Sequence, residues 1–329
     1  MLDNEFASES DLETGLTNLV TLTEAARDLG FASVFVIHHY LAELPTFQAF
    51  SLLGRLSGVS GNMRLGTGIL ILPLLPPVHV AEEFASIDRL APGGAIFGIG
   101  AGYREDEFSS FGIPLPERAT RLAESAELIK KLWTGEEVTH HGEHFDVEKQ
   151  TLSMIPRTPG GPPIWAGATA EQTIKRVASF ADAWVASPGA KAKWAAGNLQ
   201  SFKDEKIRLG HSLDTFEAPI FREVYVGENE GDWEENVGES IRRSYGAYVR
   251  YELDYFDKRF DELREKSFLF GTPDEVSEGI QFLSDAGFTE VICRVGWLGT
   301  NIETSLKTLK LLATEVMPRF KNKNDKNGN

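Results

Sequence analysis

The sequence contains a single cysteine, Cys293, which lies within the apolar run from residue 290 to residue 295. One thiol cannot form an intrachain disulfide, so the cysteine content gives no sign of an oxidising compartment. Because its neighbours are apolar, Cys293 is better interpreted as a buried structural thiol than as a nucleophile.

Long apolar runs and an excess of positive charge are also missing. No stretch approaches the roughly 18 consecutive apolar residues of a membrane span, and residues 1–10 are acidic rather than signal-like. The 33 Lys and Arg residues are outnumbered by 49 Asp and Glu, which gives a formal net charge of -16 that repels the phosphates of nucleic acid. We therefore expect a cytoplasmic protein that has neither a membrane nor a nucleic acid as its partner.

The sequence also lacks the common nucleotide, hydrolase and metal motifs. It has no P-loop, no Gly-x-Ser-x-Gly elbow and no paired cysteines. His140, His141 and His144 lie close together, but their spacing matches no zinc motif. We interpret these histidines as part of a solvated loop and predict no metal site.

What the sequence does contain is a repeated alternation of helical and strand-like segments. Apolar residues from 12 to 29 recur at three- or four-residue spacing and end at Gly30, which is typical of an amphipathic helix. The β-branched run Ser33–Ile37 follows directly and suits a strand that is covered on both faces. Further strands are predicted at 64–72, 95–100, 163–166, 183–186, 219–226 and 290–295, with a weaker one at 268–270, and helices lie between them.

This alternation predicts parallel strands joined by crossover helices. No strand is followed by Gly-x-Gly-x-x-Gly and a later acid, which disfavours the doubly wound fold. We therefore predict an α/β protein, a (β/α)8 or TIM barrel, as one domain over residues 1–320. Its first strand is weak, because only Met1–Phe6 is available: either this stub pairs, or the given start lies inside a longer reading frame.

Three segments depart from the regular pattern. Residues 135–163 are rich in Gly, Pro and His and lack a clean period, so we predict an irregular insertion over one end of the barrel. Residues 231–266 are expected to form a helical excursion. The polar residues 321–329 are expected to be a disordered tail.

The candidate site residues follow predicted strands, because chemistry in such barrels lies at the carboxyl ends of strands. His38 and His39 come directly after the strand Ser33–Ile37, and imidazole exchanges protons near neutral pH. The run Gly98–Tyr103 has glycines at alternate positions, which leaves room for a flat or phosphorylated ligand beside the backbone. Tight packing at the barrel rim is the alternative explanation. Tyr103 is suited to stack on such a ligand.

Two turns precede predicted helices. Gly167, Ala168 and Thr169 open the first helix, whose N–H groups suit a phosphate, although Thr169 would also serve as a helix cap. Thr272–Glu275 has the pattern of a capping box with two acidic residues, so we interpret it as structural.

Taken in order, several segments resemble the luciferase-like flavin-dependent monooxygenases, a family of (β/α)8 barrels with an insertion. Each segment alone is a weak signal, but their order is specific and they span most of the chain. The segments are Gly30–His39, Arg64–Pro73, Ala81–Leu90, Gly98–Tyr103, Glu107-Phe108, Phe111-Gly112, Leu132–Gly135, Pro163–Gly167 and Gly271–Val276.

The resemblance implies that reduced FMN binds at the barrel mouth and, with O2, forms a C4a-peroxyflavin that oxidises a small organic substrate. A separate flavin reductase would supply the reduced FMN, and the family suggests a homodimer. His38 matches the catalytic histidine of the luciferases, and His39 matches its neighbour. Thr67 and Gly68 match a strand end that lines the isoalloxazine, where relatives often hold a non-proline cis peptide.

The predicted site can be stated in full. The catalytic candidates are His38, His39 and Tyr103. The cofactor-binding candidates are Thr67, Gly68, Gly100, Ala101, Gly102, Tyr103, Gly167, Ala168 and Thr169.

Two positions depart from the family pattern. Ile37 stands where the family commonly has Glu, and Ala101 stands where the luciferases place an arginine that holds the flavin phosphate. FMN can still bind through backbone amides at 167–169, but two alternatives stay open. One is a deazaflavin-dependent oxidoreductase that transfers hydride without O2, and the other is a non-catalytic flavin-binding accessory protein.

Overall fold

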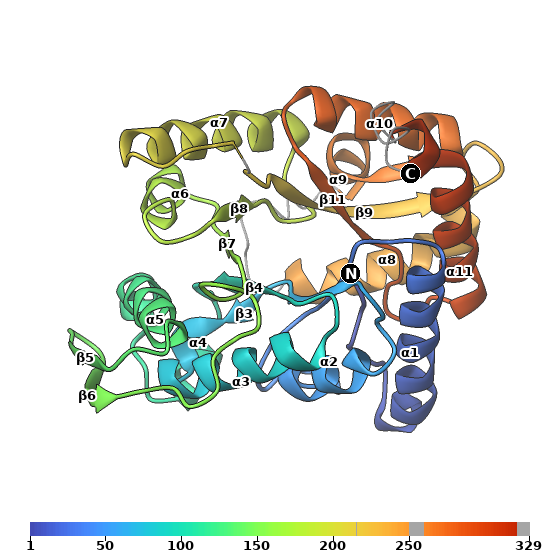
Figure 1. The fold of residues 1–329 in the computed structure, drawn as a ribbon. Coiled ribbons are helices and arrows are strands. Elements are labelled where there is room, and N and C mark those ends of the chain that lie inside the picture. Colours follow the sequence, from blue (N-terminus) through green and yellow to red (C-terminus); the bar gives the residue numbers. More distant parts are fainter. Residues whose placement is uncertain (215, 250–259, 321–329) are drawn as a thin grey trace, which may run out of the picture.

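The computed structural model describes residues 1–214, 216–249 and 260–320. Strands form the centre of the molecule and helices cover them, as Figure 1 shows. The strands are β1 (Ser33–Val36), β2 (Arg64–Thr67), β3 (Leu70–Ile71), β4 (Ala95–Gly100), β5 (Val138–His141), β6 (Asp146–Gln150), β7 (Ile164–Gly167), β8 (Ala183–Val185), β9 (Pro219–Val226), β10 (Leu269–Gly271) and β11 (Glu290–Arg294). The helices are α1 (Leu12–Asp28), α2 (Ala49–Ser57), α3 (Pro77–Leu90), α4 (Glu105–Ser110), α5 (Arg118–Trp133), α6 (Glu171–Val177), α7 (Ala192–Arg208), α8 (Trp233–Val249), α9 (Phe260–Ser267), α10 (Pro273–Asp285) and α11 (Ile302–Leu311).

The central strands pair in parallel, as the alternation predicts. One sheet has the order β1-β2-β4-β7-β8, with β3 added to β4, and a second sheet has the order β10-β9-β11. The predicted strand 64–72 is divided, because β2 pairs with β1 while β3 pairs with β4. The division falls at the Gly68–Ile69 peptide bond, which is cis. This is the strand end at which the resemblance implies a non-proline cis peptide.

Two sets of contacts join the sheets into a closed wall. A parallel bridge between Ala186 and Ile220 links the end of β8 to β9. On the other side, the amino group of Met1 donates to the carbonyl of Cys293 in β11 at 2.6 Å, and the N–H of Leu2 donates to the carbonyl of Phe35 in β1 at 2.8 Å. The amino-terminal stub therefore pairs. Together with β1, β2, β4, β7, β8, β9 and β11 it supplies the eight strand positions of a (β/α)8 barrel.

The barrel interior is packed with large side chains. Phe35, Trp165 and Phe221 come from three strands and form one cluster, in which the rings of Phe35 and Trp165 stack with centroids 5.5 Å apart. Met1 and Ile69 pack against this cluster. These side chains fill the middle of the barrel, so a ligand cavity can lie only nearer to the ends of the strands.

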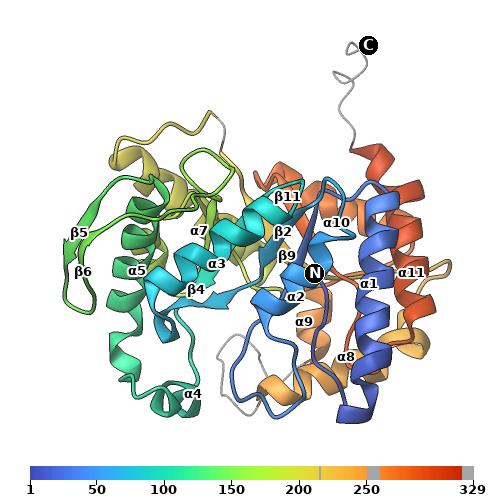
Figure 2. The same ribbon diagram turned by 60° about the horizontal axis from the view of Figure 1, so that its bottom comes forward.

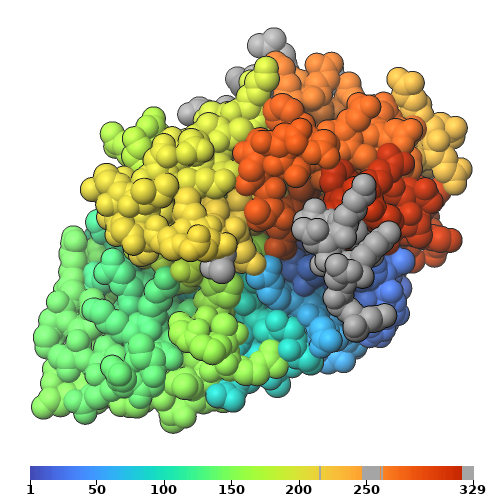
Figure 3. Space-filling model, turned by 45° about the horizontal axis from the view of Figure 1, so that its top comes forward, coloured from blue at the N-terminus to red at the C-terminus, as the bar shows by residue number. Residues whose placement is uncertain are grey.

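The first and last helices lie side by side. Figures 1 and 2 both show α1 beside α11, and Figure 3 shows the same neighbours at the surface, where blue α1 meets the red carboxyl-terminal residues. The last helix, α11, is regular only to Leu311, and a wider π-helical turn covers Leu312–Val316. The predicted tail 321–329 and part of the helical excursion, 250–259, lie outside the described residues.

The insertion at 135–163 contains an antiparallel hairpin, β5 with β6, so the prediction of an irregular segment was wrong. Its histidines are also not all solvated. His140 Nε2 lies 3.0 Å from Glu124 Oε1, and His144 Nε2 lies 2.7 Å from Thr120 Oγ1, with both partners on α5. The side chain of His141 is 66% exposed. His140 and His144 therefore anchor the hairpin to α5.

One helix cap is the one predicted from the sequence, and another is not. Thr272 and Glu275 form the predicted capping box at the start of α10. The helix after β7 begins at Glu171 with Ala170 as its cap residue, so the alternative role of Thr169 as the cap was wrong. No helix in the described ranges is both long and apolar enough to cross a membrane.

Replacing Asn4 with Ala should destabilise the fold. Asn4 is fully buried, accepts the N–H of Ile37 at 2.9 Å, and donates to the carbonyls of Ile37 at 3.1 Å and Phe47 at 2.8 Å. Each buried group left unpaired costs about 1–3 kcal/mol, so urea unfolding of Asn4→Ala should show a loss of roughly 2–5 kcal/mol. Thr17→Ala on the exposed face of α1 is the control. Equal stability of the two variants would contradict this role of Asn4.

Candidate active site

A cavity of about 400 Å³ opens at the carboxyl ends of the barrel strands. Its wall contains His38 and His39 after β1, Gly100–Tyr103 after β4, and Gly167–Thr169 after β7. Ser187, which follows β8, also lies in the wall. Residues from separate strand ends meet here because the ends of parallel strands share one rim of the barrel.

The structure brings almost every predicted site residue to this cavity. His38, His39, Gly68, Gly100, Ala101, Gly102, Tyr103, Gly167, Ala168 and Thr169 all line it. Thr67 is the exception: it is fully buried behind the wall, and its Oγ1 donates to the carbonyl of Gly98 at 2.6 Å. Thr67 therefore supports the strand that carries the glycines and is not exposed to the cavity.

His38 is held in one orientation. Its Nδ1 accepts the N–H of Ile71 at 3.2 Å, which assigns the ring proton to Nε2, and its ring packs edge-on against Tyr40 with centroids 4.6 Å apart. The side chain is almost fully buried. Burial, and to a smaller extent the nearby charge of His39, lowers the pKa of His38 to about 3. The imidazole is neutral at ordinary pH and offers one N–H as a donor.

His39 faces a buried carboxylate that the sequence reasoning did not assign to the site. Its Nδ1 lies 3.5 Å from Oε1 of Glu107, which is fully buried and accepts the N–H of Tyr40 at 2.6 Å. The ring of His39 also lies edge-on to Tyr103, with centroids 5.9 Å apart. This pair places an imidazole and a buried carboxylate side by side at the cavity wall.

The alternate glycines of β4 have a packing explanation. A Cβ at Gly98 would lie 1.8 Å from the carbonyl oxygen of Thr67, and a Cβ at Gly100 would lie 2.5 Å from the side chain of Ile69. At Gly167 the nearest atom would be 3.6 Å away, an ordinary contact. Tight packing, the alternative given for this motif, thus explains Gly98 and Gly100, while Gly167 lines the cavity and would tolerate a Cβ in ordinary contact with its neighbours.

Arg118 is a further residue that the sequence reasoning missed. It begins α5 and lines the cavity together with Thr169 and Thr173. One of its nitrogens, Nη1, donates to the carbonyl of Leu115 at 3.0 Å. The guanidinium and the two hydroxyls are donors suited to a phosphate. Although this chain has Ala101 where the family has an arginine, Arg118 supplies a cation at the cavity wall.

A second set of polar residues lines another part of the cavity wall. Glu223 of β9 is fully buried and accepts the hydroxyl of Tyr245 at 2.9 Å and the indole N–H of Trp297 at 2.5 Å. Arg294 Nη1 lies 3.6 Å from Glu223. Burial raises the pKa of Glu223 above its ordinary value, against the opposing effect of Arg294. Glu223, Tyr245 and Arg294 all border the cavity, and none of the three was predicted from the sequence.

Replacing His38 with Gln should make stability less sensitive to acid. The pKa of folded His38 is about 3, whereas the unfolded residue titrates near 6.5. Between these values the unfolded chain binds a proton that the folded chain does not, so the free energy of unfolding falls as the pH drops below about 6.5. From about pH 7.5 to about pH 5, the parent should lose roughly 2 kcal/mol more than His38→Gln in urea unfolding. Equal losses would show that His38 does not cause the acid sensitivity.

Comparisons with known proteins agree with this geometry. The family described as luciferase-like monooxygenase matches residues 1–290. A relative from Nakamurella multipartita, an F420-dependent glucose-6-phosphate dehydrogenase, is 30% identical over 219 residues, which cover 62% of this chain and 62% of the relative. The match thus spans less than two thirds of that relative's length.

Two solved structures show the same fold. The monooxygenase RslO1 from Streptomyces bottropensis has a TM-score of 0.87 at 21% identity and covers 97% of this chain and 98% of its own. The oxygenating constituent of 3,6-diketocamphane monooxygenase from Pseudomonas putida, in complex with FMN, has a TM-score of 0.77 at 18% identity, with 96% of each chain covered. With the family match over most of its length, the chain belongs to the luciferase-like monooxygenase family.

Proposed function

We propose that this protein is a flavin-dependent monooxygenase that uses reduced FMN and O2 to oxidise a small organic substrate. One observation carries the proposal: the neutral His38 and the guanidinium of Arg118 line the same cavity of about 400 Å³. Its volume lies in the range of about 300–1,000 Å³ that is usual for small-molecule sites. FMN needs both a flat wall for its ring and donors for its phosphate.

The residues present fit that cofactor. Gly167 lines the cavity without a side chain, and Ile69 and Ala101 offer apolar surface to a ring. Arg118 and the hydroxyls of Thr169 and Thr173 would hold the phosphate. Reduced FMN supplies the electrons with which O2 is activated.

The chain's own groups orient the reactants and move protons. His38 donates from Nε2 while the N–H of Ile71 holds its other nitrogen, so the donor direction is fixed. His39 and the buried Glu107 place an imidazole and a carboxylate at the wall next to Tyr103. Glu223 and Arg294 provide polar contacts for a substrate at another part of the cavity wall.

The proposal includes a setting for the enzyme. A separate reductase supplies the reduced FMN. The enzyme works as a homodimer in the cytoplasm, where reduced pyridine nucleotides can regenerate the flavin.

Arg118→Ala should weaken FMN binding and leave riboflavin binding unchanged. The variant removes a charge-assisted contact to phosphate, which riboflavin lacks, so the Kd for FMN should rise by about tenfold or more. Titrations followed by flavin fluorescence measure both ligands, and Arg118→Lys is the matched control that should recover part of the affinity. Equal weakening of the two ligands would place Arg118 away from the phosphate.

His38→Ala should slow turnover and leave FMN affinity nearly unchanged. A positioned imidazole contributes about 10²- to 10⁴-fold to proton transfer, so turnover should fall by roughly 100-fold or more. Oxygen uptake with a flavin reductase and NADPH measures this loss. Unchanged turnover under conditions where the parent is active would remove His38 from the catalytic role.

A second candidate is a deazaflavin-dependent oxidoreductase that transfers hydride without O2. It is favoured by the 30% identity to an F420-dependent dehydrogenase and by Ala101, which removes one phosphate ligand of the luciferases. An assay under nitrogen distinguishes the two candidate functions. Reduction of a deazaflavin by substrate, with no activity toward reduced FMN in air, would replace the first proposal by the second.

A further inference from the structure

The candidate active-site cavity has two arginines on opposite sides of the barrel rim. Arg118 belongs to α5, which follows β4, and Arg294 is the last residue of β11. Three strand positions separate β4 from β11 in either direction around the barrel. Arg118 Nη1 donates to the carbonyl of Leu115 at 3.0 Å, and among the residues that the structure describes no carboxylate forms an ion pair with it. Arg294 is instead surrounded by carboxylates, so the two sides of the cavity differ in charge.

Two carboxylates lie beside the guanidinium of Arg294. Its Nη2 donates to Oδ2 of Asp3 at 2.8 Å, and its Nη1 lies 3.6 Å from Oε1 of Glu223. The side chain of Arg294 is 4% exposed, that of Asp3 is 9% exposed and that of Glu223 is fully buried, so water screens these charges very little. One positive charge faces two negative ones when Glu223 is ionised, and one when it is protonated. In neither state does this side of the cavity carry a net positive charge.

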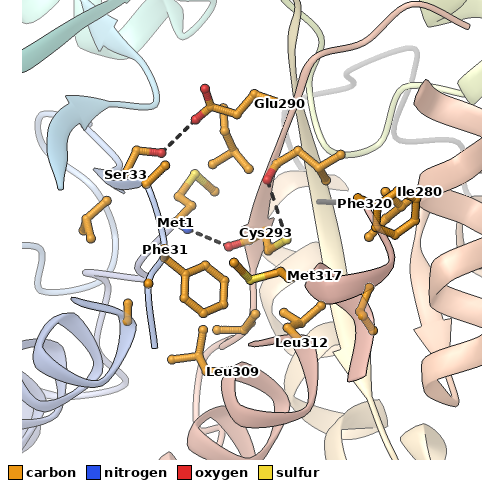
Figure 4. Close-up of a pocket in the computed structure, with 18 of the residues that line it drawn as sticks. Met1, Phe31, Ser33, Ile280, Glu290, Cys293, Leu309, Leu312, Met317 and Phe320 are labelled. Carbon is orange, nitrogen blue, oxygen red and sulfur yellow. Dashed lines mark hydrogen bonds between the residues drawn. The ribbon is translucent and has the colours of Figure 1, made fainter. Parts of the chain in front are cut away.

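The backbone brings both carboxylates to Arg294. Glu223 and Arg294 are register partners in the parallel strands β9 and β11, so their side chains leave the sheet on the same face. The amino-terminal residues lie along β11: the amino group of Met1 donates to the carbonyl of Cys293, as Figure 4 shows, and Asp3 reaches the next residue, Arg294. The neutralisation of Arg294 is therefore part of the barrel wall itself.

The other titratable groups near this side add no lasting positive charge. Burial lowers the pKa of the Met1 amino group to about 6, so this group is uncharged at higher pH. Burial, and next the charge of Asp3, raises the pKa of Glu5, which brings either no charge or a further negative one. His39 lies beside its own carboxylate, Glu107.

The surroundings of Arg294 suit an uncharged molecule with an acceptor oxygen. Phe221 precedes Glu223 by two residues on the same face of β9, and Ile69 and Val185 also line the cavity. A guanidinium has donors only, and once its charge is balanced it can still donate to a neutral oxygen. An anion at the same place would add an unbalanced negative charge beside buried carboxylates, which is costly.

We propose that Asp3 and Glu223 make this cavity selective for a substrate that is uncharged where it meets Arg294. The two carboxylates neutralise the guanidinium, so it binds a neutral oxygen and rejects a carboxylate, sulfonate or phosphate group. Anion binding is confined to the opposite side of the cavity, at Arg118. The inference deepens the proposed function and rests on it in one respect, namely that the Arg118 side holds the phosphate of the cofactor.

Asp3→Asn tests this selectivity with benzamide and benzoate as probes, because the two have nearly the same shape and differ by one negative charge. The parent should bind benzamide more tightly than benzoate. Asn can still accept the hydrogen bond from Arg294 but carries no charge, so the Kd for benzoate should fall by about tenfold or more while that for benzamide changes by less than about twofold. Ligand-observed NMR at about pH 8, where the amino group of Met1 is uncharged, measures both constants. Thermal unfolding confirms that the variant is folded.

Three further variants locate the effect. Glu223→Gln should also tighten benzoate binding, because it removes the second carboxylate. Adding Arg294→Gln to Asp3→Asn should abolish the gain, since the cation is then gone. Adding Arg118→Ala to Asp3→Asn should preserve the gain, which excludes binding of benzoate on the opposite side of the cavity.

Several results would overturn the proposal. They are equal affinity of the parent for benzoate and benzamide, no binding of benzamide by the parent at millimolar concentration, an unchanged ratio of the two constants in both Asp3→Asn and Glu223→Gln, and loss of the benzoate gain on Arg118→Ala. None of these measurements needs a bound cofactor. A failure of FMN to bind would therefore count against the proposed function alone, and it would be distinguishable from a failure of this inference.

Discussion

The pairing of residues 1–4 between β11 and β1 is the contact that closes the barrel and sets the position of the active site. Met1 and Leu2 donate backbone hydrogen bonds to opposite neighbours, and the buried Asn4 binds both backbone groups of Ile37. Ile37 immediately precedes His38. The geometry of the candidate catalytic histidine is therefore determined by the same short segment that completes the wall, although this segment has a weak strand pattern.

Burial determines the protonation of the groups around the candidate active site. His38 loses its charge because it is removed from water and its Nδ1 already accepts a hydrogen bond. Glu223 is equally buried, but two donors and a nearby guanidinium offset part of the cost of its charge. The cavity thus places a neutral donor on one side and a hydrogen-bonded carboxyl group on another.

Glycine in this site shows why a motif is an ambiguous signal. The alternation in β4 predicts close approach of a ligand, yet the neighbours that exclude a side chain at Gly98 and Gly100 are Thr67 and Ile69 of this chain. The motif located the correct rim of the barrel for a different physical reason. Thr67 illustrates the same point, since it belongs to the right strand end but lies behind the wall.

The sequence by itself determined the order of helices and strands, the parallel barrel, the capping box at Thr272 and the strand ends where the site lies, because these depend on periodicities and turn chemistry within short stretches of chain. It did not determine the hairpin at 138–150, whose anchors on α5 are distant in sequence. Only the tertiary structure decided that Arg118, Glu223 and Arg294 reach the same cavity as His38. Such contacts join residues from separate β/α units, and no local pattern records the distance between them.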